Sequence, residues 1–263
     1  LKLGGSLITD KDKTDTPDFF RLSSISAEIA AALQESPNLS LVIGHGSGSF
    51  GHHAAKIHHT RDGVSTPNEW RGFAHVGERA HALNEIVINS LVKAAIPVIS
   101  FSPSSSIVTL DHEIQAWNTL PLKAAIDNHL VPVIHGDVVF DQKIGGTILS
   151  TEELFIGLSR QFVPDRILLA GTEPGVWNNY QVKDHVLSQL SPAFFSKADP
   201  KVMLSSSPDV TGGMGSKVAI MLEIAQLHPS VEISIFSGVE SGNIYSSLIG
   251  KSLGTRISSD ERV

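Results

Sequence analysis

The chain has 263 residues, 41% hydrophobic and 18% charged, which is enough for one large α/β domain or two small ones with a buried core. Its formal charge of 20 − 27 = −7 gives no electrostatic support to a nucleic-acid partner. Cysteine is absent, which excludes disulfides, zinc–thiolate sites and cysteine nucleophiles. The apolar runs are shorter than the roughly 18 residues of a membrane span, and no signal peptide is visible. We therefore expect a cytoplasmic protein without a membrane partner.

Short apolar runs alternate with helical patterns, which predicts a mainly parallel sheet covered on both faces. In chain order, the expected strands are 1–3, 39–43, 98–101, 131–135, 166–170 and 231–236. The expected helices are 24–33, 78–95, 121–128, 151–160 and 216–227. Residues 140–149 predict a hairpin that turns near Gly145 and Gly146, and residues 205–215 predict a loop. No linker forces a division, so we expect a single domain over residues 1–263.

Four glycine-containing segments each follow an expected strand. They are KLGGS at 2–6, GHGSGSFGHH at 44–53, HGDVVFD at 135–141 and DVTGGMGSK at 209–217. Glycines in such loops let backbone N–H groups approach an anion, and the carboxyl ends of parallel strands gather at one edge of the sheet. One such loop is as often a plain tight turn, but four together predict a phosphate site.

Two familiar phosphate motifs fit poorly. Gly46 to Gly51 spells G-x-G-x-x-G, but the acidic residue at the ribose offset, Glu69, lies in a polar stretch with Pro67 and not on a strand, which weakens a nicotinamide site. The last segment ends Gly-Ser-Lys rather than Gly-Lys-Ser, so it is not a Walker A loop.

The glycine segments, together with Asp10-Lys11, Lys217 and the closing SGNIYSSLIGKSLGTRI, resemble the motifs of the amino acid kinase superfamily, in the family's order and over nearly the whole chain. Within it, HGSGSFGH at 45–52 and Asp10-Lys11 are similar to those of the isopentenyl phosphate kinases. The resemblance implies a three-layer αβα sandwich with an open sheet, an N-terminal acceptor-binding part and a C-terminal ATP-binding part. It also implies Mg²⁺ and ATP as cofactors, a homodimer, and conversion of isopentenyl phosphate to isopentenyl diphosphate in the mevalonate pathway of isoprenoid biosynthesis.

The resemblance also implies roles for individual residues. Lys2 and Lys217 would stabilise the transferring phosphoryl group. The other residues expected to bind ATP are Gly4, Gly5, Ser6, Lys11, Gly48, Thr172, Gly213 and Met214. The residues expected to bind the acceptor are Gly46, Ser47, His52 and Thr151. Mg²⁺ would be held mainly by the ATP phosphates, with no protein ligand.

His52 suits this role because a phosphate monoester is already a competent nucleophile and needs a hydrogen-bond donor rather than a general base. The further histidines His58, His59, His75 and His81 are interpreted as helix surface and pocket lining and not as a metal cluster. Apolar side chains between 73 and 86 are candidates for a slot that holds the five-carbon tail, although ordinary packing explains them equally well.

The chain departs from the family pattern at two places. Thr151 and Glu152 stand where Gly-Asp is usual; Glu152 would orient the two lysines in place of the aspartate, and it also suits the first turn of a helix. Thr172 and Pro174 replace acidic residues near the nucleotide, which puts the nucleotide preference in doubt.

Other functions stay open from sequence. A fosfomycin-type phosphonate kinase can share the histidine, whereas N-acetylglutamate and uridylate kinases are more remote. A carboxylate acceptor would call for an arginine in the acceptor loop, and none lies near Ser47 to His52. A non-catalytic metabolite-binding protein is disfavoured by the presence of both Lys2 and Lys217. An oxidoreductase is the least favoured.

Overall fold

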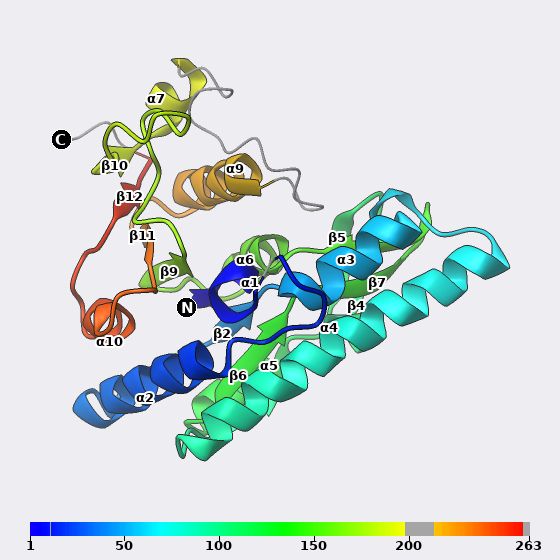
Figure 1. The fold of residues 1–263 in the computed structure, drawn as a ribbon, viewed down its shortest axis with the longest axis horizontal. Coiled ribbons are helices and arrows are strands. Elements are labelled where there is room, and N and C mark those ends of the chain that lie inside the picture. Colours follow the sequence, from blue (N-terminus) through cyan, green and yellow to red (C-terminus); the bar gives the residue numbers. More distant parts are fainter. Residues whose placement is uncertain (11, 198–212, 260–263) are drawn as a thin grey trace. The chain divides into compact units, whose positions relative to one another are not determined.

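The computed structural model describes residues 1–10, 12–197 and 213–259 (Figure 1). The chain forms two compact units, Leu1–Thr151 and Glu152–Val263, which are taken in turn. Lys11 and residues 209–212 of the fourth glycine segment lie outside the described residues.

The main sheet of the first unit is wholly parallel. Its strands, in spatial order, are β1 (Lys2–Leu3), β2 (Ile43–His45), β6 (Val131–His135) and β3 (Val98–Ser100). β1, β2 and β6 are buried, as short apolar strands covered on both faces should be. Because Leu3 pairs with His45 and His45 pairs with His135, the loops after these strands leave from the same edge of the sheet.

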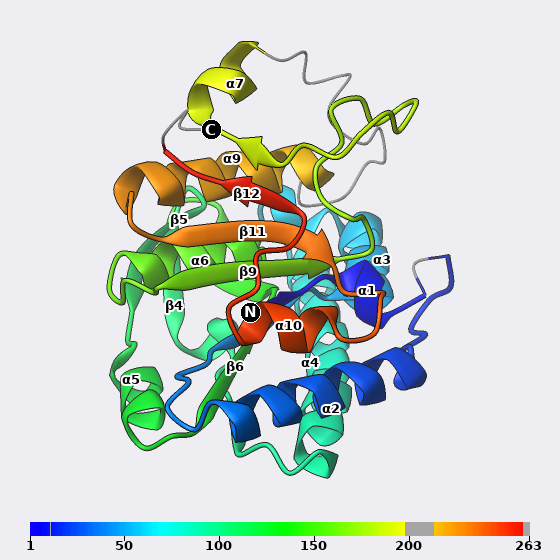
Figure 2. The same ribbon diagram turned by 90° about the vertical axis from the view of Figure 1, so that its left-hand side faces the viewer.

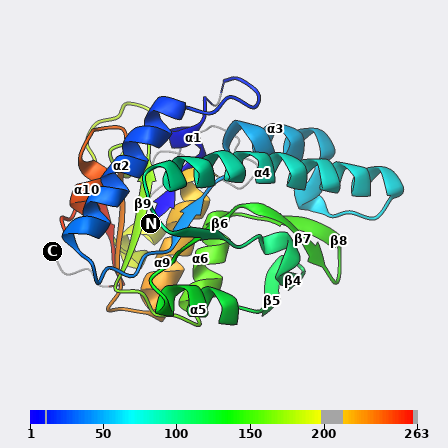
Figure 3. The same cartoon turned by 90° about the horizontal axis from the view of Figure 1, so that it is seen from below.

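Five helices accompany this sheet: α1 (Gly5–Ile8), α2 (Phe19–Glu35), α3 (Gly48–His58), α4 (Pro67–Lys93) and α5 (Leu120–Asp127). Figure 3 shows α4 and α5 on opposite faces of β6. α4 starts eleven residues before the expected position of 78, because Thr66 and Glu69 form a capping box and Pro67 occupies the first turn. Glu69 therefore caps a helix, which agrees with its rejection as a ribose ligand.

A second sheet of the first unit has the strand order β5 (Glu113–Trp117), β4 (Ile107–Leu110), β7 (Asp137–Asp141) and β8 (Gly145–Leu149). The antiparallel pair β7–β8 confirms the predicted hairpin, although it begins at Asp137. Asp141 fixes its turn by accepting hydrogen bonds from the backbone N–H groups of Lys143 and Ile144 at 2.9 and 3.0 Å.

The second unit has the strand order β10 (Gln189–Leu190), β12 (Thr255–Ile257), β11 (Glu232–Ser237) and β9 (Arg166–Gly171). β9 and β11 are parallel and β11 and β12 are antiparallel. Its helices are α6 (Thr151–Ser159), α7 (Pro192–Lys197), α9 (Gly213–Leu227) and α10 (Asn243–Leu248). α9 contacts β11 and β12, and Figure 2 shows α10 on the other side of β11 from α9.

In each unit a mainly parallel sheet carries helices on both faces, which confirms the predicted αβα class. The expected strand 39–43 is instead β2, which starts four residues later and ends two residues later. The expected loop 205–215 already becomes helical at Gly213. α3 was expected to be a loop, because Gly48, Ser49 and Gly51 are weak helix formers; packing against α1 and α4 supports it instead. No helix among the described residues is both long and apolar enough to cross a membrane.

Candidate active site

The first two glycine loops touch each other through their backbones. A Cβ atom added at Gly5 would lie 2.6 Å from the amide nitrogen of Gly48, and one added at Gly46 would lie 3.1 Å from the amide nitrogen of Gly5. Side chains at Gly5 and Gly46 would therefore push the loops apart. The N–H of Gly46 donates to the carbonyl of Leu3 at 3.2 Å, so a backbone hydrogen bond also joins the two loops.

Thr9 joins the same two loops from the end of α1. Its hydroxyl donates to the carbonyl of Gly5 at 2.8 Å and accepts from the N–H of Ser49 at 3.0 Å. A Cβ at Gly48 would lie 2.4 Å from that hydroxyl oxygen, and Gly48 itself has φ +50°, a conformation that favours glycine. Tertiary packing thus fixes Gly48 as the first residue of α3.

His52 lies on the second turn of α3, one turn beyond Gly48, and is half-buried, whereas the neighbouring His53 is exposed. Ser47 is the N-cap residue of this helix and makes no side-chain capping bond. The N-terminus of an eleven-residue helix presents backbone N–H groups and a favourable dipole to an anion. α3 therefore places Ser47, Gly48 and His52 together, as the predicted phosphate loop requires.

Lys2 is the charged residue at the base of these loops. It is only 5% exposed, although lysines are rarely buried unless they are paired. Its backbone is in register with Gly44 on β2. Burial lowers the pKa of His45, and the positive charge of Lys2 lowers it further. The first unit thus holds a buried cation next to the glycine loops. Gly4 is the N-cap of α1, and Gly5 and Ser6 form its first residues.

Thr151 and Glu152 begin α6 and are both buried, at 1% and 3% exposed. Thr151 is the last residue of the first unit, and its hydroxyl donates to the carbonyl of His45, at the end of β2, at 2.7 Å. The hydroxyl hydrogen is therefore used inside the protein. Glu152 lies in the first turn of α6, as its interpretation as a helix-start residue expects, and it is buried there.

The predicted nucleotide residues of the second unit lie on α9 and after β9. Gly213 starts α9 with φ +64°, and Met214 and Lys217 follow it, each half-buried. Thr172 is exposed immediately after β9. Beside it, the Glu173 carboxylate accepts from the Trp177 indole at 2.7 Å and from the Lys183 ammonium at 3.1 Å.

A model described as the amino acid kinase family matches residues 1–237. The chain belongs to the amino acid kinase family. It is similar to isopentenyl phosphate kinase of Methanocaldococcus jannaschii, 32% identical over 99% of this chain and 98% of the relative. The enzyme of the same name from Methanothermobacter thermautotrophicus is also 32% identical, over 98% and 97% of the two chains. A solved structure titled "X-ray structures of isopentenyl phosphate kinase" superposes with a TM-score of 0.82 at 28% identity and covers 98% of both chains.

This amino acid kinase also contains a group of titratable side chains that sequence reasoning missed. His135 and Asp137 flank Gly136 where β6 gives way to β7, and His81 on α4 contacts Asp137 at 3.0 Å. The segment HGDVVFD was recognised as a glycine loop, but its histidine and aspartate were given no role. Since His81 and Asp137 are 56 positions apart, only the packing of α4 on β7 brings them together.

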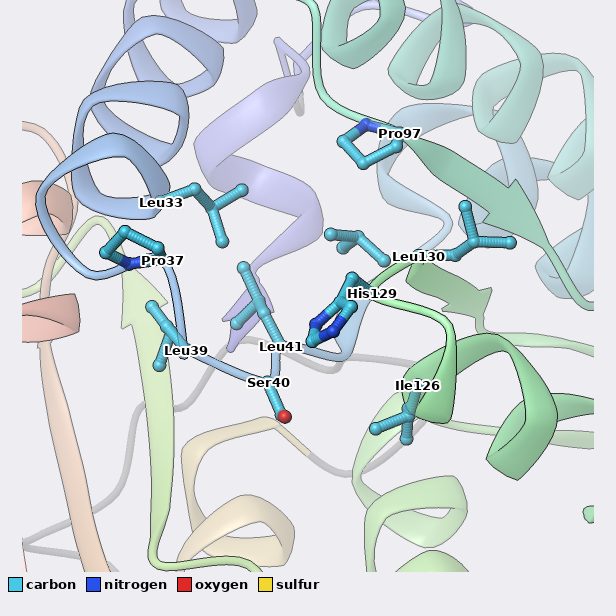
Figure 4. A pocket seen from close by; sticks show the side chains of 10 residues that line it. Leu33, Pro37, Leu39, Ser40, Leu41, Pro97, Ile126, His129 and Leu130 are labelled. Carbon is cyan, nitrogen blue, oxygen red and sulfur yellow. The ribbon is translucent and has the colours of Figure 1, made fainter.

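A separate pocket of about 140 Å³ lies at the amino ends of β2, β3 and β6 (Figure 4). Its lining is mainly apolar: Leu33, Pro37, Leu39, Ser40, Leu41, Pro97, Ile126, His129, Leu130 and Val131. Ligands of open α/β sheets bind at the carboxyl ends of the strands. The pocket is therefore at the wrong edge for phosphoryl transfer in this kinase family.

Proposed function

We propose that the chain is an ATP-dependent kinase that phosphorylates isopentenyl phosphate to isopentenyl diphosphate. The observation that carries the proposal is the similarity to isopentenyl phosphate kinases over 98–99% of this chain, at 32% identity. The local geometry supports it, because a histidine-bearing helix begins at two glycine loops that meet backbone to backbone.

The reaction needs little covalent help from the protein. An oxygen of the acceptor phosphate forms a bond to the γ-phosphorus of ATP, while the bond from that phosphorus to the bridging oxygen breaks and ADP leaves with the electron pair. No proton has to be removed from a phosphate monoester dianion, so no general base is required. The work left to the protein is positioning and the stabilisation of charge.

The residues of the first unit suit a phosphate ligand. The loops at Gly5 and Gly46 meet backbone to backbone, and Lys2, which is buried, lies on the strand that leads into the first of them. We assign His52 to hydrogen bonding with the acceptor phosphate, with Ser47 as a further contact. Gly46 and Thr151 would shape the acceptor site, since the Gly46 N–H and the Thr151 hydroxyl are already donated to the carbonyls of Leu3 and His45. Lys2 would stabilise negative charge on the transferring group.

The second unit would serve the nucleotide. Lys217, Gly213 and Met214 at the start of α9 are proposed to contact ATP phosphates, and Glu152 to orient a lysine. When bound, Mg-ATP would supply the phosphoryl group and neutralise charge on the phosphates. Mg²⁺ as the metal, a homodimer and a cytoplasmic location are parts of the proposal that derive from the family resemblance.

A coupled ADP-release assay with Mg-ATP tests this function, comparing isopentenyl phosphate, fosfomycin and N-acetylglutamate as acceptors. We expect turnover with isopentenyl phosphate and only background release with the other two. Turnover with fosfomycin alone would move the chain to the phosphonate kinases. Binding of ATP without ADP release for any acceptor would favour a non-catalytic binding protein.

A further inference from the structure

His81, His135 and Asp137 bring three potential metal ligands together at the end of β6. One nitrogen from each histidine and one carboxylate oxygen lie within 4.8 Å of one another. His81 Nε2 is 3.0 Å from Asp137 Oδ2, and His135 Nε2 is 3.7 Å from the same oxygen. The three residues come from α4, β6 and β7, so the backbone holds each ligand in place.

His135 has no hydrogen-bond partner in the described part of the chain, although it is completely buried. A neutral imidazole carries one lone pair and one N–H group, and neither has a partner here among the described residues. Buried polar atoms are nearly always satisfied, and each exception needs an explanation. The His135 ring lies between two other imidazoles. It stacks on His45 with the ring centroids 5.5 Å apart, and it meets His81 edge-on with the ring centroids 5.3 Å apart.

We propose that His81 Nε2, His135 Nε2 and Asp137 Oδ2 form a binding site for a divalent transition metal, with Zn²⁺ as the representative ion. Two neutral imidazoles and a carboxylate are a ligand set that zinc takes, with water or an anion in the fourth position. Tetrahedral ligands about 2.0–2.1 Å from zinc are about 3.3 Å apart. The separations of 3.0 and 3.7 Å between the histidine nitrogens and Asp137 Oδ2 bracket that value, and all three ligand atoms lie within 4.8 Å of one another, so side-chain movement within the group closes the site.

The surroundings of Asp137 resemble those of a metal-binding carboxylate. Its second oxygen, Oδ1, accepts from the N–H of Val138 at 2.8 Å, and Oδ2 accepts from the N–H of Ser104 at 3.2 Å. Such outer-shell hydrogen bonds fix the orientation of a ligand. In the metal-free state His81 donates to Asp137, and the metal takes the place of that proton.

A second pair of histidines on the same unit offers a competing explanation for any zinc binding. His58 Nε2 and His75 Nδ1 are 3.1 Å apart; His75 is exposed and His58 is half-buried, and no carboxylate of the described residues completes a metal group with them. Two imidazoles alone should bind zinc weakly. A test must therefore separate the three-residue group from this pair.

The experiment uses the full chain, stripped with a chelator and titrated with Zn²⁺ in competition with a chromophoric chelator. Co²⁺ serves as a spectroscopic probe of the coordination. We expect one Zn²⁺ per chain, a rise in Tm and visible d–d bands of low-symmetry Co²⁺. The His81→Asn variant should weaken zinc binding by about 100-fold or more, above the roughly 10–100-fold effect of outer-shell changes. Its side chain is 48% exposed, so folding should survive.

Two controls make the result decisive. His59→Asn alters a histidine outside the group that has φ +51°, which asparagine tolerates, and it should leave zinc binding unchanged. His58→Asn/His75→Asn removes the surface pair and should do the same. Zinc binding that survives His81→Asn, that disappears with the surface pair, or that is absent from the unaltered chain would overturn the proposal. His135→Asn provides a second variant, which should abolish the Co²⁺ bands while the far-UV CD spectrum stays unchanged.

Discussion

Replacing Gly48 by alanine should destabilise the first unit, because this position combines a left-handed backbone with a crowded neighbour. The φ of +50° costs a non-glycine residue about 1–2 kcal/mol. The added methyl would lie 2.4 Å from the Thr9 hydroxyl oxygen and 2.7 Å from the Thr9 methyl, and such overpacking costs about 1–3 kcal/mol. Alanine regains about 0.4–1 kcal/mol through the unfolded chain. The free energy of unfolding should therefore fall by about 1–5 kcal/mol, with a central value near 3 kcal/mol.

Two other glycines separate the contributions to this loss. Gly242 has φ +87° and no atom within 4 Å of an added Cβ, so Gly242→Ala should show the backbone cost alone, about 1 kcal/mol. Gly171 lacks both features, and Gly171→Ala should be neutral or slightly stabilising. Urea denaturation followed by CD measures the free energy of unfolding of all three variants. Each kcal/mol lost from this free energy corresponds to a fall of about 2–4 °C in Tm.

A double-mutant cycle with Thr9→Ala identifies the clash directly. Truncating Thr9 removes the two nearest atoms that the new methyl would meet and leaves the Gly5 carbonyl oxygen at 3.1 Å. The double variant should therefore be less destabilised than the sum of the single variants by about 1–3 kcal/mol. If Gly48→Ala were no more costly than Gly242→Ala, or if the cycle showed no coupling, the two loops would not be packed as described.

The remaining predictions concern the hairpin and the proposed kinase site. Burial alone would raise the pKa of Asp141, but hydrogen bonds from Ile144, Thr109 and neighbouring groups hold it well below its usual value. The ionised Asp141 therefore stabilises the fold at neutral pH, and this contribution is lost as the pH falls through the pKa of the folded state. Asp141→Asn should cost about 2–3 kcal/mol at pH 7 and progressively less towards acid, measured by denaturation across pH. His52→Ala should raise the KM for isopentenyl phosphate more than the KM for ATP in steady-state assays. Lys217→Ala should lower kcat by about 100-fold or more. Glu152→Asp should retain or improve activity.

Matched controls exist for each of these variants. Asp127→Asn changes an aspartate that is 55% exposed, and it should leave the pH profile of stability unchanged. His53→Ala alters the exposed neighbour of His52, and Lys251→Ala alters an exposed lysine of the second unit. Equal effects of His52→Ala on both KM values, or an unchanged kcat in Lys217→Ala, would remove these residues from the proposed roles. A folded but inactive Glu152→Asp variant would show that the site has been built around the longer side chain.

The sequence by itself determined the features that depend on local pattern. Alternation of apolar runs and helical periods predicted β6 at its observed bounds, and the order of the glycine segments identified the family. Glu69 lies in a polar stretch with Pro67, which argues against a ribose ligand, and the structure shows it in the capping box of α4. Helix starts and short turns follow from neighbouring residues, and one chain is enough to read them.

Only the tertiary structure decided features that depend on distant residues. α3 begins at Gly48 because of contacts with Gly5 and Thr9, about forty positions earlier, which outweigh the weak helix propensity of its glycines. Thr151 reaches the carbonyl of His45 across 106 positions. His81 meets His135 and Asp137 only because α4 packs on β6 and β7. Sequence patterns specify which face of an element is buried, but the register between elements sets which side chains meet, and no local pattern encodes it.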